Sequence, residues 1–329
     1  MSRAELSALK ALSATLGSNP LLVQAAGGNT SLKSKDIMWI KASGTWLNDA
    51  ATKDIFVPLD LTRLLKALGE NDPACESCTD FVRQDINPLG LRPSIETSVH
   101  GLMPQAVVLH VHCVNTIAWA IQENAEVLLA PIMANFNWGF VPYARPGLEL
   151  SRAIGKALKP ITDVLILENH GLVVAAATTV EAGLLLDKVI GVLKRTVIPT
   201  KAPDLRKLAR IADGTDYRLP ADKNCHGFAT DKSVCKIAAR HAYYPDHVVF
   251  LGPEIPSDFS LDVPAIAIPG AGVLVHKNAK PAVEPMLRCL SDVFARLAPT
   301  TKLNALTSAE IGALLNWDAE KYRQSLKIE

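Results

Sequence analysis

The chain has 329 residues, of which 49% are hydrophobic and 20% charged, and its formal net charge at pH 7 is +1. This composition is typical of a globular protein of one or two domains, and it gives no support for nucleic acid or an anionic membrane as a partner. No apolar run approaches the roughly 20 residues of a membrane-spanning helix, and six cysteines are too few for a disulfide scaffold. We therefore expect a cytoplasmic protein.

The first hundred residues alternate helical and strand-like patterns. Residues 1–17 have the spacing of an amphipathic helix, and 25–47 predict short strands joined by glycine-containing turns. Asp60–Leu68 is predicted to be helical. In residues 92–104, we expect Ser94 to be the N-cap of a short helix that ends at Pro104.

The middle of the chain continues this alternation. Residues 106–112, AVVLHVH, predict a strand, and the segment that follows has a helical apolar face. Residues 163–177 predict two strands on either side of Asn169-His170-Gly171, with the glycine supplying the turn. Thr178 and Glu181 have the spacing of a capping box, which predicts a helix through Val192.

The pattern weakens after residue 200. Tyr243–Phe250 and residues 271–276 predict strands, and helices are expected around Met286–Leu297 and Ala309–Leu326. In this interpretation Asp246 and His247 belong to the polar start of a strand. The predicted organisation is a domain of residues 1–198 and a smaller α/β extension, residues 199–329, of unknown role.

A possible metal site begins with the histidines of VVLHVHCVN. Alternate residues of a strand point to the same face, so His110 and His112 would stand side by side. Together with Glu96 and His170, they suit Zn²⁺ or a similar divalent ion with one position open to substrate. The alternative is a pair of core histidines bonded to backbone carbonyls. Cys75 and Cys78 form a single CxxC, which we interpret as an incidental loop pair because a zinc ribbon needs a second pair.

Five motifs, GGNTS, the SG of KASGTWL, PSIET, HVH and NHGLVV, occur in the order found in the class II aldolase/adducin family, which the chain resembles over roughly residues 5–195. The resemblance implies a three-layer α/β/α fold with a mainly antiparallel sheet, and a homotetramer. It also implies that His110, His112 and His170 bind zinc, or Mn²⁺, Co²⁺ or Fe²⁺. Glu96 matches the glutamate that ligates the resting metal or acts as acid and base. Five further residues match the family's substrate-phosphate contacts: Gly28, Asn29, Ser43, Gly44 and Ser94.

The chain departs from the aldolases of this family at two places. They have a serine directly before the glutamate, where this chain has Ile95, and the fuculose-phosphate enzyme uses a tyrosine that AEVLLAPIMANF lacks. The substrate therefore need not be phosphorylated, and Glu123, Glu126 and Tyr143 are candidate proton donors by neighbourhood only. Lys33 and Lys41 would add positive charge near the phosphate contacts or lie solvated on their strands.

The function expected from these features is retro-aldol cleavage of a small sugar-derived ketose, sugar phosphate or keto acid through a metal-stabilised enediolate. A decarboxylase or 4-epimerase would use the same site, so the sequence leaves these reactions open. An adducin-like binding module and a buried structural zinc are the non-enzymatic alternatives. GxGxxG does not occur, so nicotinamide binding is not supported.

Overall fold

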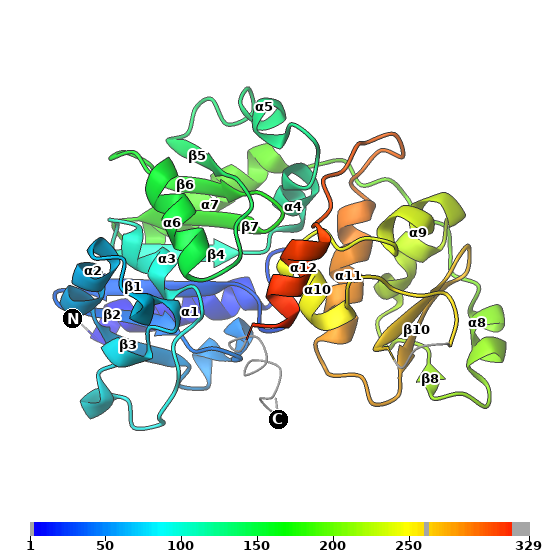
Figure 1. The fold of residues 1–329 in the computed structure, drawn as a ribbon, viewed down its shortest axis with the longest axis horizontal. Helices are drawn as coiled ribbons and strands as arrows, with labels where there is room; N and C mark the ends of the chain where they lie inside the picture. The colour runs from blue at the N-terminus through cyan, green and yellow to red at the C-terminus, as the bar shows by residue number, and fades with distance from the viewer. Residues whose placement is uncertain (1–2, 260–262, 318–329) are drawn as a thin grey trace.

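The computed structural model describes residues 3–259 and 263–317. It contains a seven-stranded sheet with the order β3-β2-β1-β4-β7-β6-β5 (Figure 1). Neighbouring strands are antiparallel except β5 and β6, which are parallel, so the predicted mainly antiparallel α/β fold is confirmed. In chain order the strands are β1 (Asn29–Ser34), β2 (Ile37–Lys41), β3 (Phe56–Asp60), β4 (Val107–Val111), β5 (Trp138–Val141), β6 (Val164–Leu167) and β7 (Gly171–Ala176).

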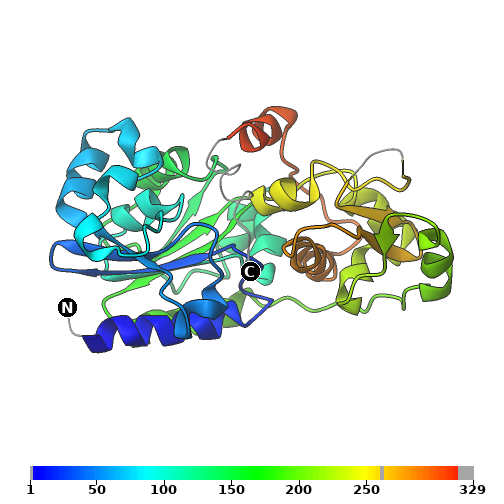
Figure 2. The same cartoon turned by 90° about the horizontal axis from the view of Figure 1, so that it is seen from below.

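Helices cover both faces of this sheet. Figure 2 shows α1 on one face and the cyan helices on the other. The first face is covered by α1 (Arg3–Gly17) and α7 (Thr179–Leu193), and the second by α2 (Leu61–Gly69), α3 (Thr97–Leu102) and α6 (Leu148–Ala157). Side chains of β4 alternate between the two cores: Val107 and Leu109 pack toward α1 and α7, and Val108 packs toward α3 and α6. His110 therefore projects from the same face as Val108.

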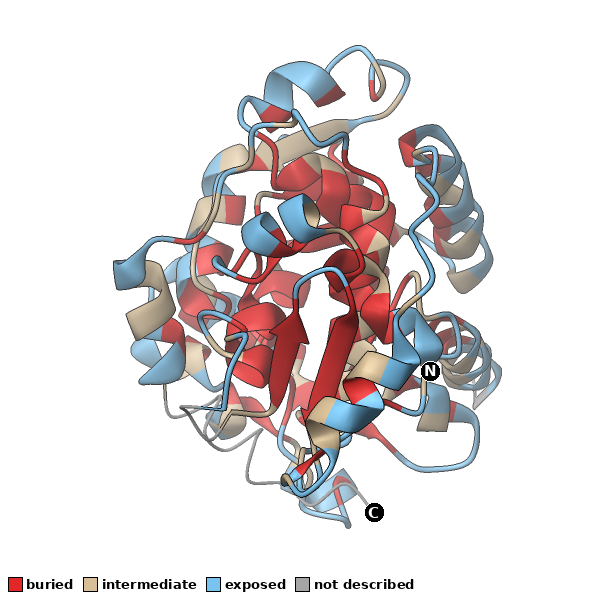
Figure 3. Ribbon diagram, turned by 90° about the vertical axis from the view of Figure 1, so that its right-hand side faces the viewer, coloured by how far each residue is buried: buried red, intermediate tan, exposed pale blue. Residues whose placement is uncertain are grey.

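A smaller three-stranded sheet, with the order β8-β10-β9, follows in the chain. Two of its strands, β9 and β10, are almost entirely buried and appear red in Figure 3. The strands are β8 (Tyr217–Arg218), β9 (Ala265–Ile268) and β10 (Gly272–His276). The remaining helices are α4 (Val114–Ala120), α5 (Ala125–Leu129), α8 (Leu205–Ala212), α9 (Lys232–Ala238), α10 (Pro245–Leu251), α11 (Val283–Phe294) and α12 (Ser308–Leu315). Short 3-10 turns are η1 (Leu47–Ala51), η2 (Pro73–Glu76), η3 (Thr79–Phe81), η4 (Gln84–Ile86) and η5 (Lys223–Ala229). Among the described residues, no helix is both long and apolar enough to cross a bilayer.

One hydrophobic core joins the C-terminal region to α4, which follows β4 of the large sheet. Val114, Ile117 and Ile121, which belong to or directly follow α4, lie in the same buried cluster as residues of α10 and α11. Burial of apolar area contributes about 25 cal/mol per Å², so a core shared by both regions stabilises their association. The C-terminal region is thus packed against the end of the large sheet rather than tethered to it by a linker.

Local signals in the sequence predicted several helix starts correctly. Thr178 and Glu181 form the predicted capping box at the start of α7, with Oγ1 of Thr178 accepting from the Glu181 amide at 3.2 Å. The predicted helix near Asp60 begins at Leu61, and the Asp60 carboxylate accepts from the Arg63 amide. These helix starts are predictable because a capping interaction involves residues no more than three positions apart.

The prediction of a strand at Tyr243–Phe250 was wrong, because the structure has helix α10 there with Pro245 in its first turn. Every residue of α10 is buried, and a short run that is buried on all sides has no periodicity to distinguish a helix from a strand. Helix α11 begins at Val283, three residues before the predicted start. Of the predicted helix Ala309–Leu326, the structure has α12 to Leu315, and residues 318–326 lie outside the described part.

The predicted N-cap at Ser94 was also wrong. Helix α3 begins at Thr97, and Glu96 occupies the N-cap position without a capping side-chain bond. Ser94 instead forms a tight turn, in which its carbonyl accepts from the Thr97 amide at 3.1 Å and its hydroxyl accepts from the Glu96 amide at 3.3 Å. The delayed helix start leaves the Glu96 side chain available for other contacts.

Candidate metal centre

The candidate site lies where three strand ends meet. Strands β1 and β7 both run antiparallel to β4, so their N-terminal ends flank the C-terminal end of β4. Asn29 at the start of β1 pairs with His110 on β4, His112 follows β4, and His170 directly precedes β7. The topology therefore brings together motifs that are far apart in the sequence.

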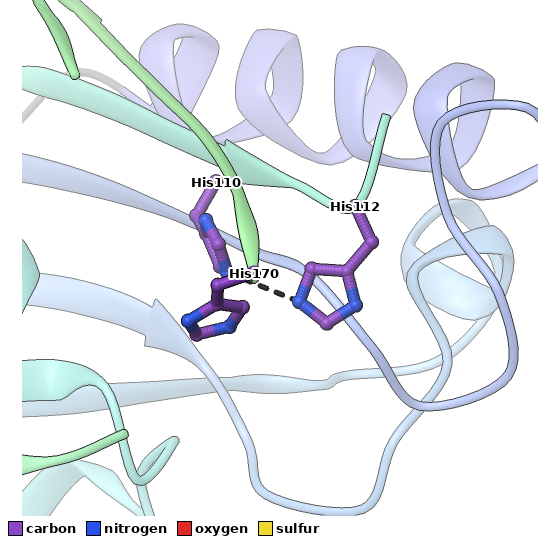
Figure 4. Close-up of side chains that lie close together, drawn as sticks. All are labelled: His110, His112 and His170. Atoms are coloured by element: carbon purple, nitrogen blue, oxygen red, sulfur yellow. Dashed lines mark hydrogen bonds between the residues drawn. The ribbon is translucent and has the colours of Figure 1, made fainter. Parts of the chain in front are cut away.

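The three histidines converge as the sequence predicts. One ring nitrogen from each of His110, His112 and His170 lies within 4.8 Å of the others, and all three side chains are buried (Figure 4). Their ring centroids are 5.0–5.2 Å apart. Among the described residues, this is the one cluster of three or more potential ligands that could hold a metal ion.

The contacts of Nδ1 indicate which nitrogen His110 and His112 present to the cluster. Nδ1 of His110 donates to the Leu172 carbonyl at 3.1 Å, and Nδ1 of His112 lies 3.1 Å from Oδ2 of Asp246. Protons on these nitrogens leave a lone pair on each Nε2, and the two Nε2 atoms face each other at 3.2 Å. Two facing lone pairs repel unless a cation or a proton lies between them, so this arrangement fits a bound metal ion.

Glu96 lies beside the cluster. Its carboxylate oxygens are 3.4 Å from Nε2 of His110 and 3.3 Å from Nε2 of His170. The Asn29 amide donates to Oε2 at 2.8 Å, and the side-chain oxygen of Asn29 contacts His100, which in turn bonds Ser31. Glu96 is therefore held in place by a buried polar network and is close enough to the histidines to ligate a metal or to move a proton.

The charges of the site also favour a cation. Burial opposes ionisation of Glu96, but the attraction of the carboxylate to the protonated forms of His110, His170 and His112, together with the Asn29 amide, outweighs it and lowers the pKa of Glu96 to about 2. Burial lowers the pKa of His110, and it lowers that of His170 to about 3. Neutral imidazoles beside an ionised, buried carboxylate are a suitable ligand set for a divalent metal ion, and they leave negative charge for it to balance.

The five predicted phosphate contacts line the same pocket as the metal-site residues. Gly28, Asn29, Ser43, Gly44 and Ser94 surround it together with Glu96, His112 and His170. The segments are joined by backbone bonds, since the Ser43 amide donates to the Arg92 carbonyl and the Ser94 amide to the Lys41 carbonyl. Gly28 has a positive φ of 64°, and a Cβ there would lie 2.9 Å from the His110 carbonyl oxygen. Glycine is therefore required where this loop crosses β4.

The two lysines have different environments. Lys41 lines the pocket and is buried, and its ammonium group donates to the carbonyls of Ala26 at 3.0 Å and Thr45 at 2.6 Å. It joins the GGN loop to the SG loop and is not solvated. Lys33 lies toward the other end of β1, where it bonds the carbonyls of Met103 and Gln105, and burial lowers its pKa to about 7.

Comparison with known proteins agrees with this arrangement. Residues 9–189, more than half of the chain, match the profile described as the class II aldolase and adducin N-terminal domain. The chain belongs to the class II aldolase/adducin family.

Several known proteins are similar to this chain. "Uncharacterized oxidoreductase YuxG" of Bacillus subtilis (strain 168) is 32% identical over 179 residues, which make up 50% of this chain and 25% of that protein. The chain thus matches only a quarter of the relative's length. A class II aldolase domain from Thermoplasma acidophilum is 26% identical with a TM-score of 0.49, covering 56% of this chain and 90% of the other. An L-fuculose-1-phosphate aldolase from Thermus thermophilus is 15% identical with a TM-score of 0.41, covering 65% and 99%.

Some sequence-based candidates lie outside the pocket of this class II aldolase-family chain. Glu123 and Glu126 are exposed, and neither lines the pocket. The Tyr143 hydroxyl is buried, and burial raises its pKa. Ile95 does line the pocket, half-buried, at the position where the family's aldolases have a serine. Cys75 and Cys78 are buried free thiols and do not belong to the histidine cluster.

Sequence reasoning missed two residues of the site. Asp246, at the start of α10, lines the pocket and contacts His112. Gly27 precedes the predicted Gly28, and a Cβ on it would lie 2.7 Å from Oδ2 of Asp246 and 2.8 Å from Nδ1 of His112. An acidic residue inside an otherwise apolar segment was the available signal for Asp246, because such residues are seldom buried without a partner.

Proposed function

We propose that the protein is a divalent-metal-dependent lyase that cleaves a carbon–carbon bond in a small sugar-derived ketose, sugar phosphate or keto acid. The observation that carries this proposal is the convergence of three buried imidazoles and the Glu96 carboxylate beside a pocket lined by glycine and serine loops. We also propose Zn²⁺ as the resident ion. We propose that the protein assembles as a homotetramer, and light scattering, which measures its molar mass, tests this.

Each group has a distinct part in this reaction. His110, His112 and His170 would hold the cation, which supplies a Lewis acid for the charge that develops when a bond beside a carbonyl breaks. Glu96, 3.3–3.4 Å from two of the imidazoles, would transfer the proton. The amides and hydroxyls of the GGN, SG and Ser94 segments would bind an anionic end of the substrate.

The pocket contains about 20 Å³ of free space, enough for an ion or a water molecule. A sugar-sized ligand occupies a pocket of roughly 300 Å³ or more. Substrate binding therefore requires side chains at the rim to move. Ile95 and Ser43 are the half-buried lining residues through which the pocket reaches solvent, and we propose that substrate enters on their side.

Metal analysis and a substrate screen test the proposal together. We expect the purified protein to contain close to one divalent ion per chain and to release a two- or three-carbon fragment from one member of a panel of sugar phosphates, ketoses and sugar acids. His170→Ala should abolish both properties. The exposed His241, outside the pocket, provides the matched control His241→Ala.

The products separate the remaining reactions. Carbon dioxide without an aldehyde fragment would identify a decarboxylase, and an inverted stereocentre with no fragment would identify a 4-epimerase. A protein with no affinity for divalent ions would contradict the enzyme proposal and favour an adducin-like binding module. The oxidoreductase name of the Bacillus protein does not carry over to this chain, because the match covers a quarter of that protein.

A further inference from the structure

We propose that Asp246 of the C-terminal region is a positioning residue of the metal centre, which orients His112 for metal binding. This inference rests on the proposed metal-binding function. It assigns a role to a region that lies outside the matched family domain of residues 9–189.

The contact between the two side chains is close and buried. Oδ2 of Asp246 lies 3.1 Å from Nδ1 of His112, and the side chains are 4% and 7% exposed, respectively. A carboxylate at Nδ1 keeps the proton on that nitrogen and directs the lone pair of Nε2 to the opposite side of the ring. On that side, Nε2 of His112 faces Nε2 of His110 at 3.2 Å. Asp246 therefore selects the tautomer that a metal ligand needs.

His112 requires such a partner more than His110 does. His110 lies within β4, and its Nδ1 is bonded to a backbone carbonyl of the neighbouring strand β7. His112 follows the last residue of β4, where the strand no longer constrains it. The Asp246 carboxylate therefore fixes the ring of His112, as the Leu172 carbonyl of β7 fixes the ring of His110.

The surrounding backbone leaves room for this pair. Gly27 approaches so closely that a Cβ would lie 2.7 Å from Oδ2 of Asp246 and 2.8 Å from Nδ1 of His112. Since Gly27 does not have a positive φ, its lack of a side chain matters here for space rather than for backbone conformation. The loop with the predicted anion contacts is thus also shaped around the His112–Asp246 pair.

The helix that carries Asp246 is held firmly against the metal site. All seven residues of α10 are buried, and the helix packs against α11 and α12, as Figure 1 shows. Just before α10, the Tyr243 carbonyl accepts from the Asn169 side chain at 2.9 Å, and Asn169 belongs to the turn that carries His170. The C-terminal region is therefore linked to two of the three histidines, directly to His112 and through Asn169 to His170.

Metal affinity of the full chain tests the proposal without an enzyme assay. Zn²⁺ affinity is measured by competition with a chromogenic chelator for the wild type, Asp246→Ala and Asp246→Asn. Loss of a partner that orients a ligand typically costs about 10–100-fold in metal affinity. We expect a loss of that size for Asp246→Ala and a smaller one for Asp246→Asn, whose amide oxygen still accepts from Nδ1. The visible spectrum of the Co²⁺-loaded variants should also change, because the geometry of His112 changes.

Asp292→Asn is the matched control. Asp292 is a half-buried carboxylate of the same region, paired with Arg288 and Arg296, and it does not line the metal pocket. Its replacement should leave Zn²⁺ affinity within about twofold of the wild type, whatever it does to stability. Circular dichroism of the metal-free proteins verifies folding, and Asp246→Asn, which preserves shape, decides the question if Asp246→Ala does not fold.

The results separate this inference from the proposed function. Wild-type affinity and an unchanged Co²⁺ spectrum in Asp246→Asn and in folded Asp246→Ala would overturn the role of Asp246 and leave the three-histidine site intact. Failure of the wild type itself to bind Zn²⁺ or Co²⁺ would overturn both proposals. A loss in the Asp246 variants with a normal control supports the positioning role.

Discussion

Two buried carboxylates contact the three histidines at different points. Glu96 lies against Nε2 of His110 and His170, on the nitrogens that a metal would use, whereas Asp246 lies against Nδ1 of His112. The first is therefore placed to exchange protons with a substrate or to enter the ligand set. The second is placed to orient a ligand.

Glu96→Gln separates these roles. Because an amide neither accepts nor releases the proton, we expect fragment release to slow by about 10²–10⁴-fold. Zn²⁺ affinity should fall less, since three imidazoles remain. Glu168→Gln is the control, because Glu168 bonds the Tyr143 amide and Asn304 outside the pocket. Unchanged turnover in Glu96→Gln would instead indicate a structural ion.

Gly27→Ala tests how tightly the loop packs on the site. The added methyl group would lie 2.7–2.8 Å from Asp246 and His112, so one of them must shift. We expect Zn²⁺ affinity to fall by about 10–100-fold, the loss typical of a disturbed ligand partner. Gly155→Ala in α6, where no atom lies within 4 Å of the new Cβ, should leave affinity unchanged and raise stability by about 0.5–1 kcal/mol. Equal affinities in the two variants would contradict this packing argument.

At the scale of elements, the turn between β6 and β7 determines where His170 lies. Asn169 has a φ of +52°, and its side chain donates to the carbonyls of Tyr243 at 2.9 Å and Asn304 at 2.6 Å. The turn was predicted to depend on Gly171, which instead begins β7 without a positive φ. A Cβ on Gly171 would lie 2.7 Å from the Val111 carbonyl oxygen, so glycine serves close strand packing there.

Substitutions at Asn169 distinguish its backbone from its side chain. Asn169→Ala should destabilise the protein by about 2–4 kcal/mol, through the left-handed conformation and two lost hydrogen bonds. Glycine adopts the left-handed conformation readily, so Asn169→Gly should lower the free energy of unfolding by only about 1–2 kcal/mol, through the lost hydrogen bonds. Urea denaturation measures both. Asn124, which has a φ of 59° and no capping bond, serves as control, since Asn124→Gly should be nearly neutral. Equal losses for Ala and Gly at position 169 would show that the backbone conformation costs nothing.

The candidate metal site lies where the two regions of the chain meet. Their shared core includes Ile117 and Ile121 of the first region and Leu287 and Leu290 of α11. The division into a domain of residues 1–198 and an extension remains a prediction. The contacts at Asp246 and in the shared core indicate that the two parts unfold together.

Chelation tests this coupling. A ligand at 100 times its Kd stabilises the native state by about 2.7 kcal/mol, so EDTA should lower the unfolding temperature of the protein and Zn²⁺ should restore it. Because the regions share a core and a site, calorimetry should show a single unfolding transition, and its midpoint temperature should fall with EDTA and rise again with Zn²⁺. Two transitions, with only the first sensitive to metal, would contradict the coupling.

Much of the candidate site was predictable because its signals are local. Two histidines one residue apart at the end of a strand must point the same way, and the glycine and serine turns are recognisable within a few residues. The start of α7 was predictable for the same reason. The helix at Pro245–Leu251, and with it the position of Asp246, was not, because a fully buried run of seven residues is compatible with either a strand or a helix.

Strand periodicity predicted that His110 and His112 stand side by side, and the order of five short motifs indicated the family resemblance that assigned roles to His170, Glu96 and the glycine and serine loops. Tertiary packing brings α10 to the end of β4, where Asp246 meets His112 and Gly27 must lack a side chain to allow the contact. The contacts of Asp246 join residues more than a hundred positions apart, and such contacts form through packing of a common core that no local pattern specifies.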